Sequence, residues 1–237
     1  PAVYLLRCPE LYADSDLYRG ADEHLRFILL SRAAIEMCQR LKFAPDIFHC
    51  HDWHTALIPI YLKTCYVWDR LFAASRTVLT IHNIGFQGVF GAGILYETGL
   101  SSSPAMLDQD DLAADRINFL KTGIMYADLL TTVSPTYARE IRTREFGYGL
   151  EGLLGDDVLA AGLRLGDRLH RQERSLGLDV VHVGGVGDPG VLHGPADALG
   201  HLLDQVRHLV QLAGAHHQID KRRPFENLSL MVLGHTT

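Results

Sequence analysis

Three histidines, a cysteine and an aspartate stand close together in the segment HCHDWH, residues 49–54. On a strand, His49 and His51 would lie on the same face, as the two ligands of an H-x-H metal site do. A histidine pair at a strand end can equally be held by backbone carbonyl groups and neighbouring carboxylates, without any ion. We favour this second interpretation, and we predict no metal site here.

A second polar pair, His82 and Asn83, follows the apolar run TVLTI at 77–81. An imidazole ring can donate and accept hydrogen bonds, and an amide offers both kinds of group, a combination that suits sugar hydroxyls. Polar groups satisfied within the protein would be of the same residue types. The spacing alone therefore leaves a binding role and a structural role open.

Alternating strands and helices along the first 154 residues decide where these polar groups lie. Apolar and β-branched runs predict strands, and apolar residues recurring every three or four positions predict helices. The expected strands span 4–6, 47–50, 77–81 and 129–133, and the expected helices span 22–41, 55–66, 116–126 and 135–141. In the last helix, Ser134 is the expected N-cap and Pro135 occupies the first helical position.

This alternation predicts an α/β fold, a Rossmann-like parallel sheet with helices on both faces. In such sheets, ligands bind beyond the carboxyl ends of the strands. The strands that end near residues 50, 81 and 133 should therefore bring Asp52, His82 and Ser134 to one edge of the sheet.

The composition changes near Gly155, and we expect a domain at 1–154 followed by an unrelated tail at 155–237. The tail holds one of the 20 aromatic residues but 12 of the 22 glycines and 8 of the 13 histidines. So abrupt a change is typical of a translated wrong reading frame as well as of a tail that is helical in part. Both origins of the tail remain open.

Within the tail, residues 178–183 predict a strand and residues 196–213 predict an amphipathic helix. Glycines at 185, 187 and 190 match a dinucleotide-binding pattern, but the prolines and glycines after them disfavour the helix that this pattern must open. We therefore expect neither nucleotide binding nor a second Rossmann-like domain in the tail.

The charge and the apolar runs exclude two classes of partner. A formal net charge of -6 gives no basic field for nucleic acid. No apolar run reaches the roughly 20 residues that span a bilayer, and no leader is visible, so we expect a cytoplasmic protein without membrane contact. The four cysteines lack C-x-x-C spacing, which disfavours a zinc knuckle.

Four ordered segments resemble successive blocks of the ADP-glucose-dependent glycogen and starch synthases, a glycosyltransferase family. These are PDIFHCHDWHTALIPIYLK at 45–63, TVLTIHNIGFQGVF at 77–90, INFLKTGIMYADLLTTVSPTYAREI at 117–141 and EFGYGLEGLL at 145–154. Four blocks in the right order and spacing are far more specific than a single motif.

The resemblance implies a two-domain glucosyltransferase that adds glucose from ADP-glucose to the non-reducing end of an α-1,4-glucan, with retained anomeric configuration and no cofactor. It implies that His82 and Asp52 act in catalysis. It also implies substrate-side roles, direct or supporting, for Asn83, Gln87, Trp53, His54, Tyr137 and Tyr148, although Trp53 and Tyr137 could simply pack in the core. For a plant protein, the expected location would be the plastid.

Departures from the family pattern qualify this expectation. The Lys-x-Gly-Gly turn and the second domain, which meet the donor phosphates in the family, are not recognisable in this sequence. We expect residues 1–237 alone to transfer no glucose. Two alternatives remain open: a glucan-binding remnant without catalysis, and a metal-dependent hydrolase built on His49, His51 and His54.

Overall fold

A computed structural model describes residues 2–6, 8–12, 23–154, 180–185 and 229–234. Its helices and strands are, in chain order, β1 (Ala2–Leu6), α1 (Pro9–Tyr12), α2 (Glu23–Leu41), β2 (Ile47–His51), α3 (Asp52–Thr55), α4 (Ile58–Lys63), η1 (Arg70–Phe72), β3 (Arg76–Ile81), β4 (Val89–Gly91), η2 (Ala92–Ile94), α5 (Leu95–Thr98), η3 (Pro104–Met106), α6 (Gln109–Ala113), β5 (Arg116–Asn118), α7 (Phe119–Tyr126), β6 (Leu129–Thr132), α8 (Pro135–Glu140), β7 (Val180–Gly185) and β8 (Ser229–Gly234). Within these ranges, none of the helices combines the length and the apolar character that crossing a bilayer requires.

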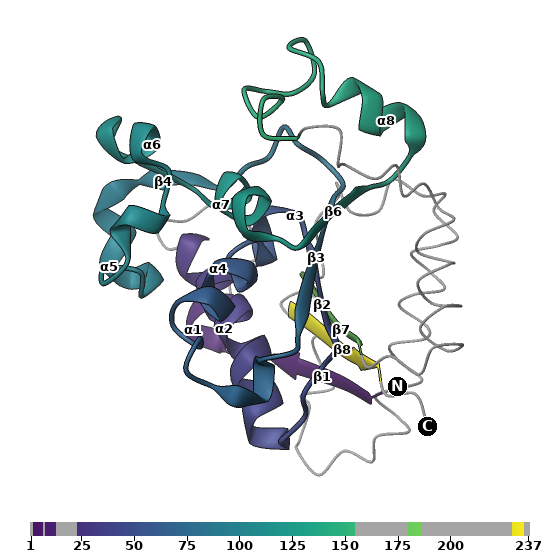
Figure 1. Ribbon diagram of the computed structural model, residues 1–237. Helices are drawn as coiled ribbons and strands as arrows, with labels where there is room; N and C mark the ends of the chain where they lie inside the picture. The colour runs from purple at the N-terminus through teal and green to yellow at the C-terminus, as the bar shows by residue number, and fades with distance from the viewer. Residues whose placement is uncertain (1, 7, 13–22, 155–179, 186–228, 235–237) are drawn as a thin grey trace.

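The main sheet has six strands in the order β1-β8-β7-β2-β3-β6 (Figure 1). The strands β7, β2, β3 and β6 run parallel to one another, and β8 runs antiparallel to both of its neighbours. Because β2, β3 and β6 are parallel and adjacent, their carboxyl ends reach the same edge. The predicted α/β fold with a parallel sheet is confirmed.

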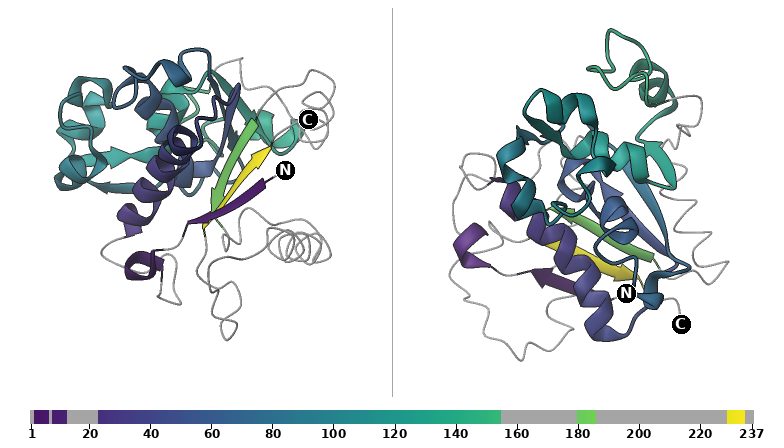
Figure 2. Two further views of the ribbon diagram at one scale, coloured as in Figure 1. Left: turned by 90° about the horizontal axis from the view of Figure 1, so that it is seen from below. Right: turned by 60° about the vertical axis from the view of Figure 1, so that its left-hand side comes forward.

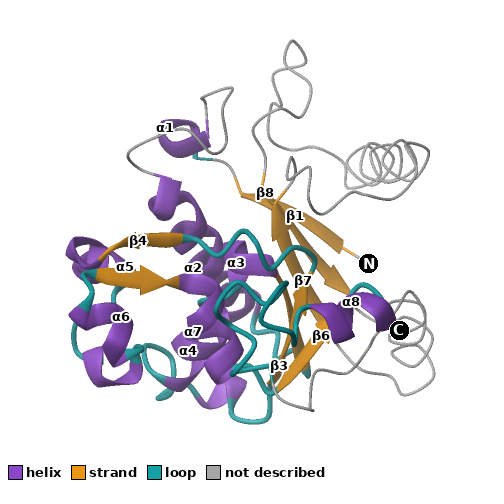
Figure 3. Ribbon diagram, turned by 90° about the horizontal axis from the view of Figure 1, so that it is seen from above, coloured by secondary structure: helices purple, strands orange, loops and turns teal. Residues whose placement is uncertain are grey.

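One face of this sheet carries the core. Phe48 and Cys50 of β2 and Leu79 and Ile81 of β3 are all fully buried. The helices α2, α4 and α7 gather on one side of the sheet, and the two-stranded ribbon β4–β5 lies beyond them (Figure 3). The alternation along each strand thus separates an apolar face under the helices from a second face, on which the histidines of β2 lie.

The long helix α2 matches the expected span over the described residues, from Glu23 to Leu41. Its buried apolar residues recur at three- and four-residue spacings, so a single stripe of the helix meets the core: Phe27, Leu30, Ala34, Ile35 and Cys38. Burial of this stripe, rather than helix propensity, stabilises the helix.

Two predicted helices differ from the observed elements. The helix expected at 55–66 is two short helices, α3 and α4, and Pro59 lies at the start of the second. Proline has no N–H and restrains the residue before it, so a continuous helix is interrupted there. The helix expected at 116–126 begins with strand β5, which pairs with β4 before α7 starts at Phe119.

The described parts of the tail join the main sheet. The strand predicted at 178–183 is found as β7, between β2 and β8, and Figure 2 shows green β7, yellow β8 and purple β1 side by side. The predicted helix at 196–213 and most of the glycine pattern fall outside the described residues. The division of the chain at residue 155 stays a prediction.

Candidate active site

The turn between β2 and α3 places Asp52 at the carboxyl edge of the sheet. Asp52 has a φ of +51°, in the left-handed region that aspartate and asparagine tolerate better than most residues. The hydroxyl of Thr55 accepts from the backbone N–H of His51 at 2.7 Å and donates to its carbonyl oxygen at 3.1 Å, which fixes the turn. The Asp52 side chain is 2% exposed.

The carboxyl group of Asp52 joins the end of β2 to the end of β3. Its Oδ1 accepts hydrogen bonds from the backbone N–H of His82 at 2.7 Å and of Asn83 at 3.1 Å. The side chain of Asn83 in turn accepts from the backbone N–H of Gly85 at 3.0 Å. The expected meeting of Asp52 and His82 on one edge is therefore confirmed, and Asp52 shapes the backbone that presents His82.

A row of polar side chains crosses the sheet on the face opposite the core. His51 Nδ1 lies 3.0 Å from His82 Nε2, and the rings of His49 and His51 lie 4.3 Å apart between centroids. His49 Nε2 contacts the hydroxyl of Thr80 at 2.7 Å, and that hydroxyl contacts the hydroxyl of Thr131 at 2.7 Å. The row links β2, β3 and β6 through side chains as well as through the backbone.

The third strand end is tied to the same loop by Tyr137. Ser134 caps α8 as predicted, since its hydroxyl accepts from the backbone N–H of Tyr137 at 3.0 Å. The phenol oxygen of Tyr137 accepts from the backbone N–H of Ile84 at 2.9 Å. Burial raises the pKa of Tyr137, and the hydrogen bond from Ile84 opposes this rise. Tyr137 therefore supports the His82 loop from the side of α8.

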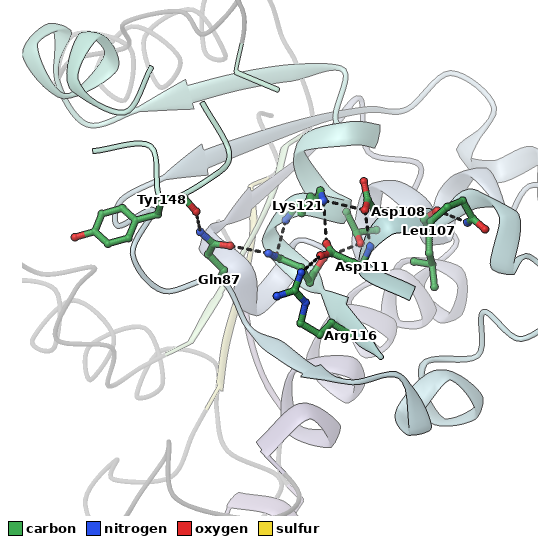
Figure 4. A network of polar contacts seen from close by, with 10 residues as sticks. Gln87, Leu107, Asp108, Asp111, Arg116, Lys121 and Tyr148 are labelled. Atoms are coloured by element: carbon green, nitrogen blue, oxygen red, sulfur yellow. Dashed lines mark hydrogen bonds and ion pairs between the residues drawn. The ribbon is translucent and has the colours of Figure 1, made fainter. Parts of the chain in front are cut away.

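Gln87 clasps two loops together (Figure 4). Its Nε2 donates to the carbonyl oxygens of Ile84 at 3.3 Å and Tyr148 at 3.1 Å, and its Oε1 accepts from Asn118 Nδ2 at 2.6 Å. Asn118 also caps α7, since its Oδ1 accepts from the backbone N–H of Lys121. Both ends of the Gln87 amide thus bond within the protein, and its role toward substrate stays a prediction.

A cluster of ion pairs next to Asn118 joins α6, β5 and α7, and the sequence analysis missed it. Lys121 Nζ lies 2.9 Å from Asp108 and 3.0 Å from Asp111, and Asp111 also pairs with Arg116 at 2.9 Å (Figure 4). The hydrogen bond from Lys121 is the main cause that lowers the pKa of Asp108. The asparagine that precedes the helix in INFLK could have signalled the cap of α7, because asparagine is a favoured N-cap, but it gives no signal for the ion pairs.

Trp53 and His54 lie in the core behind the site. Trp53 is 4% exposed and packs edge-to-face on Phe27, with ring centroids 4.5 Å apart. His54 is equally buried, and its ring meets the same phenylalanine at 4.6 Å. Their positions support the site from behind, and any contact of theirs with substrate stays a prediction. Tyr148, in contrast, is 66% exposed.

Burial makes His54 sensitive to acid. Desolvation, and secondarily the nearby His82, lower the pKa of His54 from 6.5 to about 3. Between pH 6.5 and about 3, His54 is protonated in the unfolded chain but stays neutral in the folded chain. The free energy of unfolding therefore decreases as the pH falls through this window. We expect the free energy of unfolding to fall by up to about 1.4 kcal/mol per pH unit in this window.

Urea unfolding at several pH values between about 7 and 4 measures this loss. The variant His54→Leu should have a shallower pH dependence across the window, because it removes the group that titrates. His24→Gln is the matched control, since His24 is also buried but contacts Glu97 on α5. A slope that persists in His54→Leu and disappears in His24→Gln would assign the effect to the wrong histidine.

The three histidines of the H-x-H-x-x-H pattern do not converge. His49 and His51 face each other on one side of the sheet, whereas His54 packs on Phe27 of α2 on the other. Among the residues that the structure describes, no group of three or more histidine, cysteine, aspartate or glutamate side chains is placed to hold a metal ion. This geometry gives no support to the hydrolase alternative.

Comparison with known proteins connects the site to a family. A family model described as the starch synthase catalytic domain matches residues 2–156. The glycogen synthase of Thermodesulfovibrio yellowstonii is 47% identical over 133 residues, which cover 56% of this chain and 27% of that protein. The glycogen synthase of Pseudothermotoga lettingae is 44% identical over 153 residues, which cover 65% of this chain and 31% of that protein.

A solved structure agrees with these relatives. The catalytic domain of Starch Synthase IV from Arabidopsis thaliana, bound to ADP and acarbose, is similar with a TM-score of 0.55 and 25% identity. The similarity covers 84% of this chain and 47% of that one. Because the matches cover 27% and 31% of the two glycogen synthases, the chain spans less than a third of the length of these curated relatives.

Proposed function

Because the chain belongs to the family of the starch synthase catalytic domain, we propose that it forms part of a glucosyltransferase acting on ADP-glucose and an α-1,4-glucan. The observation that carries the proposal is the hydrogen bonding of Asp52 Oδ1 to the backbone of His82 and Asn83. It joins the two sequence blocks in which the family resemblance places the catalytic residues.

In the proposed reaction, the bond from the anomeric carbon to the phosphate oxygen of ADP breaks and a bond to the terminal hydroxyl oxygen of the glucan forms with the configuration retained. The proton of that hydroxyl leaves with the ADP phosphate. The glucosyl group passes through a state with oxocarbenium character, so positive charge develops on the ring. We assign His82 to the transferred glucose, through its ring and its carbonyl oxygen. Groups fixed before the reaction stabilise such charge most effectively.

Asp52 is assigned two tasks in this scheme. It fixes the turn that carries His82, as its hydrogen bonds indicate, and its carboxyl group lies at the edge where donor and acceptor would meet. Asn83 and the exposed Tyr148 are assigned to the glucan side, with Gln87 and Tyr137 holding their loops. The donor carries its own leaving group, so the proposed reaction needs no cofactor.

A chimera tests this proposal directly. In the Pseudothermotoga lettingae glycogen synthase, the matched segment is replaced by the corresponding 153 residues of this chain. We expect this protein, called the chimera below, to incorporate glucose from ADP-glucose into glycogen. His82→Ala in the chimera should lower kcat by about 100-fold or more while changing the KM for glucan little, because the contact strengthens in the transition state.

Gly93→Ala is the matched control, since the methyl group meets no atom within 4 Å. A folded chimera without transfer, or full activity in His82→Ala, would refute the proposed roles. Glycogen binding by the 237-residue chain, with no transfer by the folded chimera, would favour the alternative of a glucan-binding remnant.

A further inference from the structure

A contact between two imidazole rings holds the side chain of His82. His51 Nδ1 and His82 Nε2 are 3.0 Å apart, and the ring centroids are 5.2 Å apart at an interplanar angle of 42°. His51 is the last residue of β2 and His82 follows the last residue of β3, so the parallel pairing of these strands brings the rings together.

His51 is itself held on two sides. Its backbone is fixed by the hydroxyl of Thr55, and its ring lies against the ring of His49. His49 is anchored in turn by Thr80 on the neighbouring strand. A side chain held in this way can orient a second group. Because it is already ordered, no further side-chain entropy is lost from it when that group binds a ligand.

The contact restricts the chemistry of the ring as well as its position. In a hydrogen bond between two imidazoles, one nitrogen donates and the other accepts, so the partner of each ring determines which of its nitrogens carries the proton. Two fully protonated rings would place two donors against each other. The contact therefore ties the tautomer of His82 to that of His51: His82 carries its proton on Nδ1 when His51 Nδ1 donates, and on Nε2 when His51 Nδ1 accepts.

We propose that His51 is a positioning residue that fixes the orientation and the tautomer of the His82 ring for its contact with the sugar donor. The part of this proposal that names the sugar rests on the proposed function. Asp52 fixes the backbone of His82 and His51 fixes its ring, so the residue is held at two independent points.

The groups around the pair come from several elements. On β2 the ring of His49 lies against that of His51 in a tilted arrangement, and on α3 Asp52 accepts from the His82 backbone. His54, also on α3, is close enough for His82 to lower its pKa. From α8, Tyr137 bonds to Ile84 in the same loop. A measured titration of His82 therefore reports this whole neighbourhood, and the tautomer is the more specific measurement.

Nitrogen NMR of the 237-residue chain, labelled at histidine, tests the proposal without any substrate. Long-range proton–nitrogen correlations distinguish the two neutral tautomers of His82. We expect one tautomer in the unchanged chain and a mixture, or the other tautomer, in His51→Leu. His51→Asn should keep a hydrogen bond to the His82 ring, because its amide can either donate or accept, but for the same reason it should allow both tautomers.

His24→Gln is the matched control, because it removes a histidine that contacts Glu97 and the ring of Phe90 instead. An unchanged His82 tautomer in a folded His51→Leu chain would overturn the proposal. If His51→Leu does not fold, His51→Phe replaces the ring by one of similar shape without nitrogen, and the same reading applies.

Activity supplies a separate test. In the chimera, His51→Leu should lower kcat by about 10- to 100-fold with little change in the KM for glucan, and His51→Asn should recover most of the loss. Failure of the chimera to transfer glucose would reject the proposed function and leave the NMR result standing. An active chimera in which His51→Leu has no effect would reject the positioning role alone.

Discussion

Replacing Asp52 by alanine should lower the free energy of unfolding by about 3 kcal/mol and abolish glucose transfer in the chimera. The substitution removes the oxygen that accepts from the backbone N–H groups of His82 and Asn83. Each buried donor left without a partner costs about 1–3 kcal/mol. The lower values apply here, because His82 and Asn83 are only partly buried. Transfer is lost because the loop that carries His82 is no longer held.

Two further variants separate the contributions of Asp52. Asp52→Asn keeps an accepting oxygen and tolerates the left-handed conformation, so it should cost no more than about 1 kcal/mol. Asp52→Gly relaxes the positive φ but removes the acceptor, so it should resemble the alanine variant in activity. Urea unfolding of the 237-residue chain measures the stabilities. Equal stability of Asp52→Ala and the unchanged chain would show that the two hydrogen bonds contribute nothing.

The sequence predicted the part of the site that depends on the order of strands. Because β-branched runs alternate with helices, the ends of β2 and β3 had to meet at one edge, and Asp52 and His82 do meet there. The cap at Ser134 was predictable for a similar reason, since a serine before Pro135 satisfies an N–H of the first turn. Both inferences follow from local chemistry and from the geometry of parallel sheets.

The partners of individual side chains could not be predicted in this way. His51 and His82 lie 31 residues apart in the chain, and Gln87 meets Tyr148 across 61 residues. Such pairs depend on rotamers and loop paths that periodicity does not encode. The ribbon β4–β5 was missed because Ile117 lies three residues before Leu120 and so continues the apolar pattern of α7, and the antiparallel pairing with Val89–Gly91 overrides that local pattern.

Replacing Gly88 by alanine should lower the free energy of unfolding by about 3–4 kcal/mol. Gly88 has a φ of +61°, where alanine costs about 1–2 kcal/mol. Its methyl group would also lie 2.3 Å from Cε3 of Trp53. The indole cannot withdraw, because Phe27 lies at 4.5 Å between ring centroids, and the Gly88 carbonyl accepts from the backbone N–H of Phe119. Overpacking of this kind costs about 1–3 kcal/mol more.

Three other glycines separate strain from contact. Gly149→Ala has a φ of +83° in open space, so it should show the conformational cost alone, about 1–2 kcal/mol. Gly123→Ala adds a methyl group 2.6 Å from Cβ of Ala56 in ordinary helix, so it should show the contact alone, reduced by about 1 kcal/mol through the higher helix propensity of alanine. Gly93→Ala has neither feature and should lie within about 0.5 kcal/mol of the unchanged chain.

If Trp53 is held rigidly by its packing on Phe27, Gly88→Ala should lower the free energy of unfolding by at least the sum of the losses measured for Gly149→Ala and Gly123→Ala. A loss no larger than that of Gly149→Ala would mean that Trp53 moves aside. In that case the movement of the Trp53 side chain should be visible as a change in tryptophan fluorescence. Because Trp53 directly follows Asp52, a movement of the indole would also disturb the turn that holds His82, so the same variant in the chimera should lose activity in proportion to the fluorescence change.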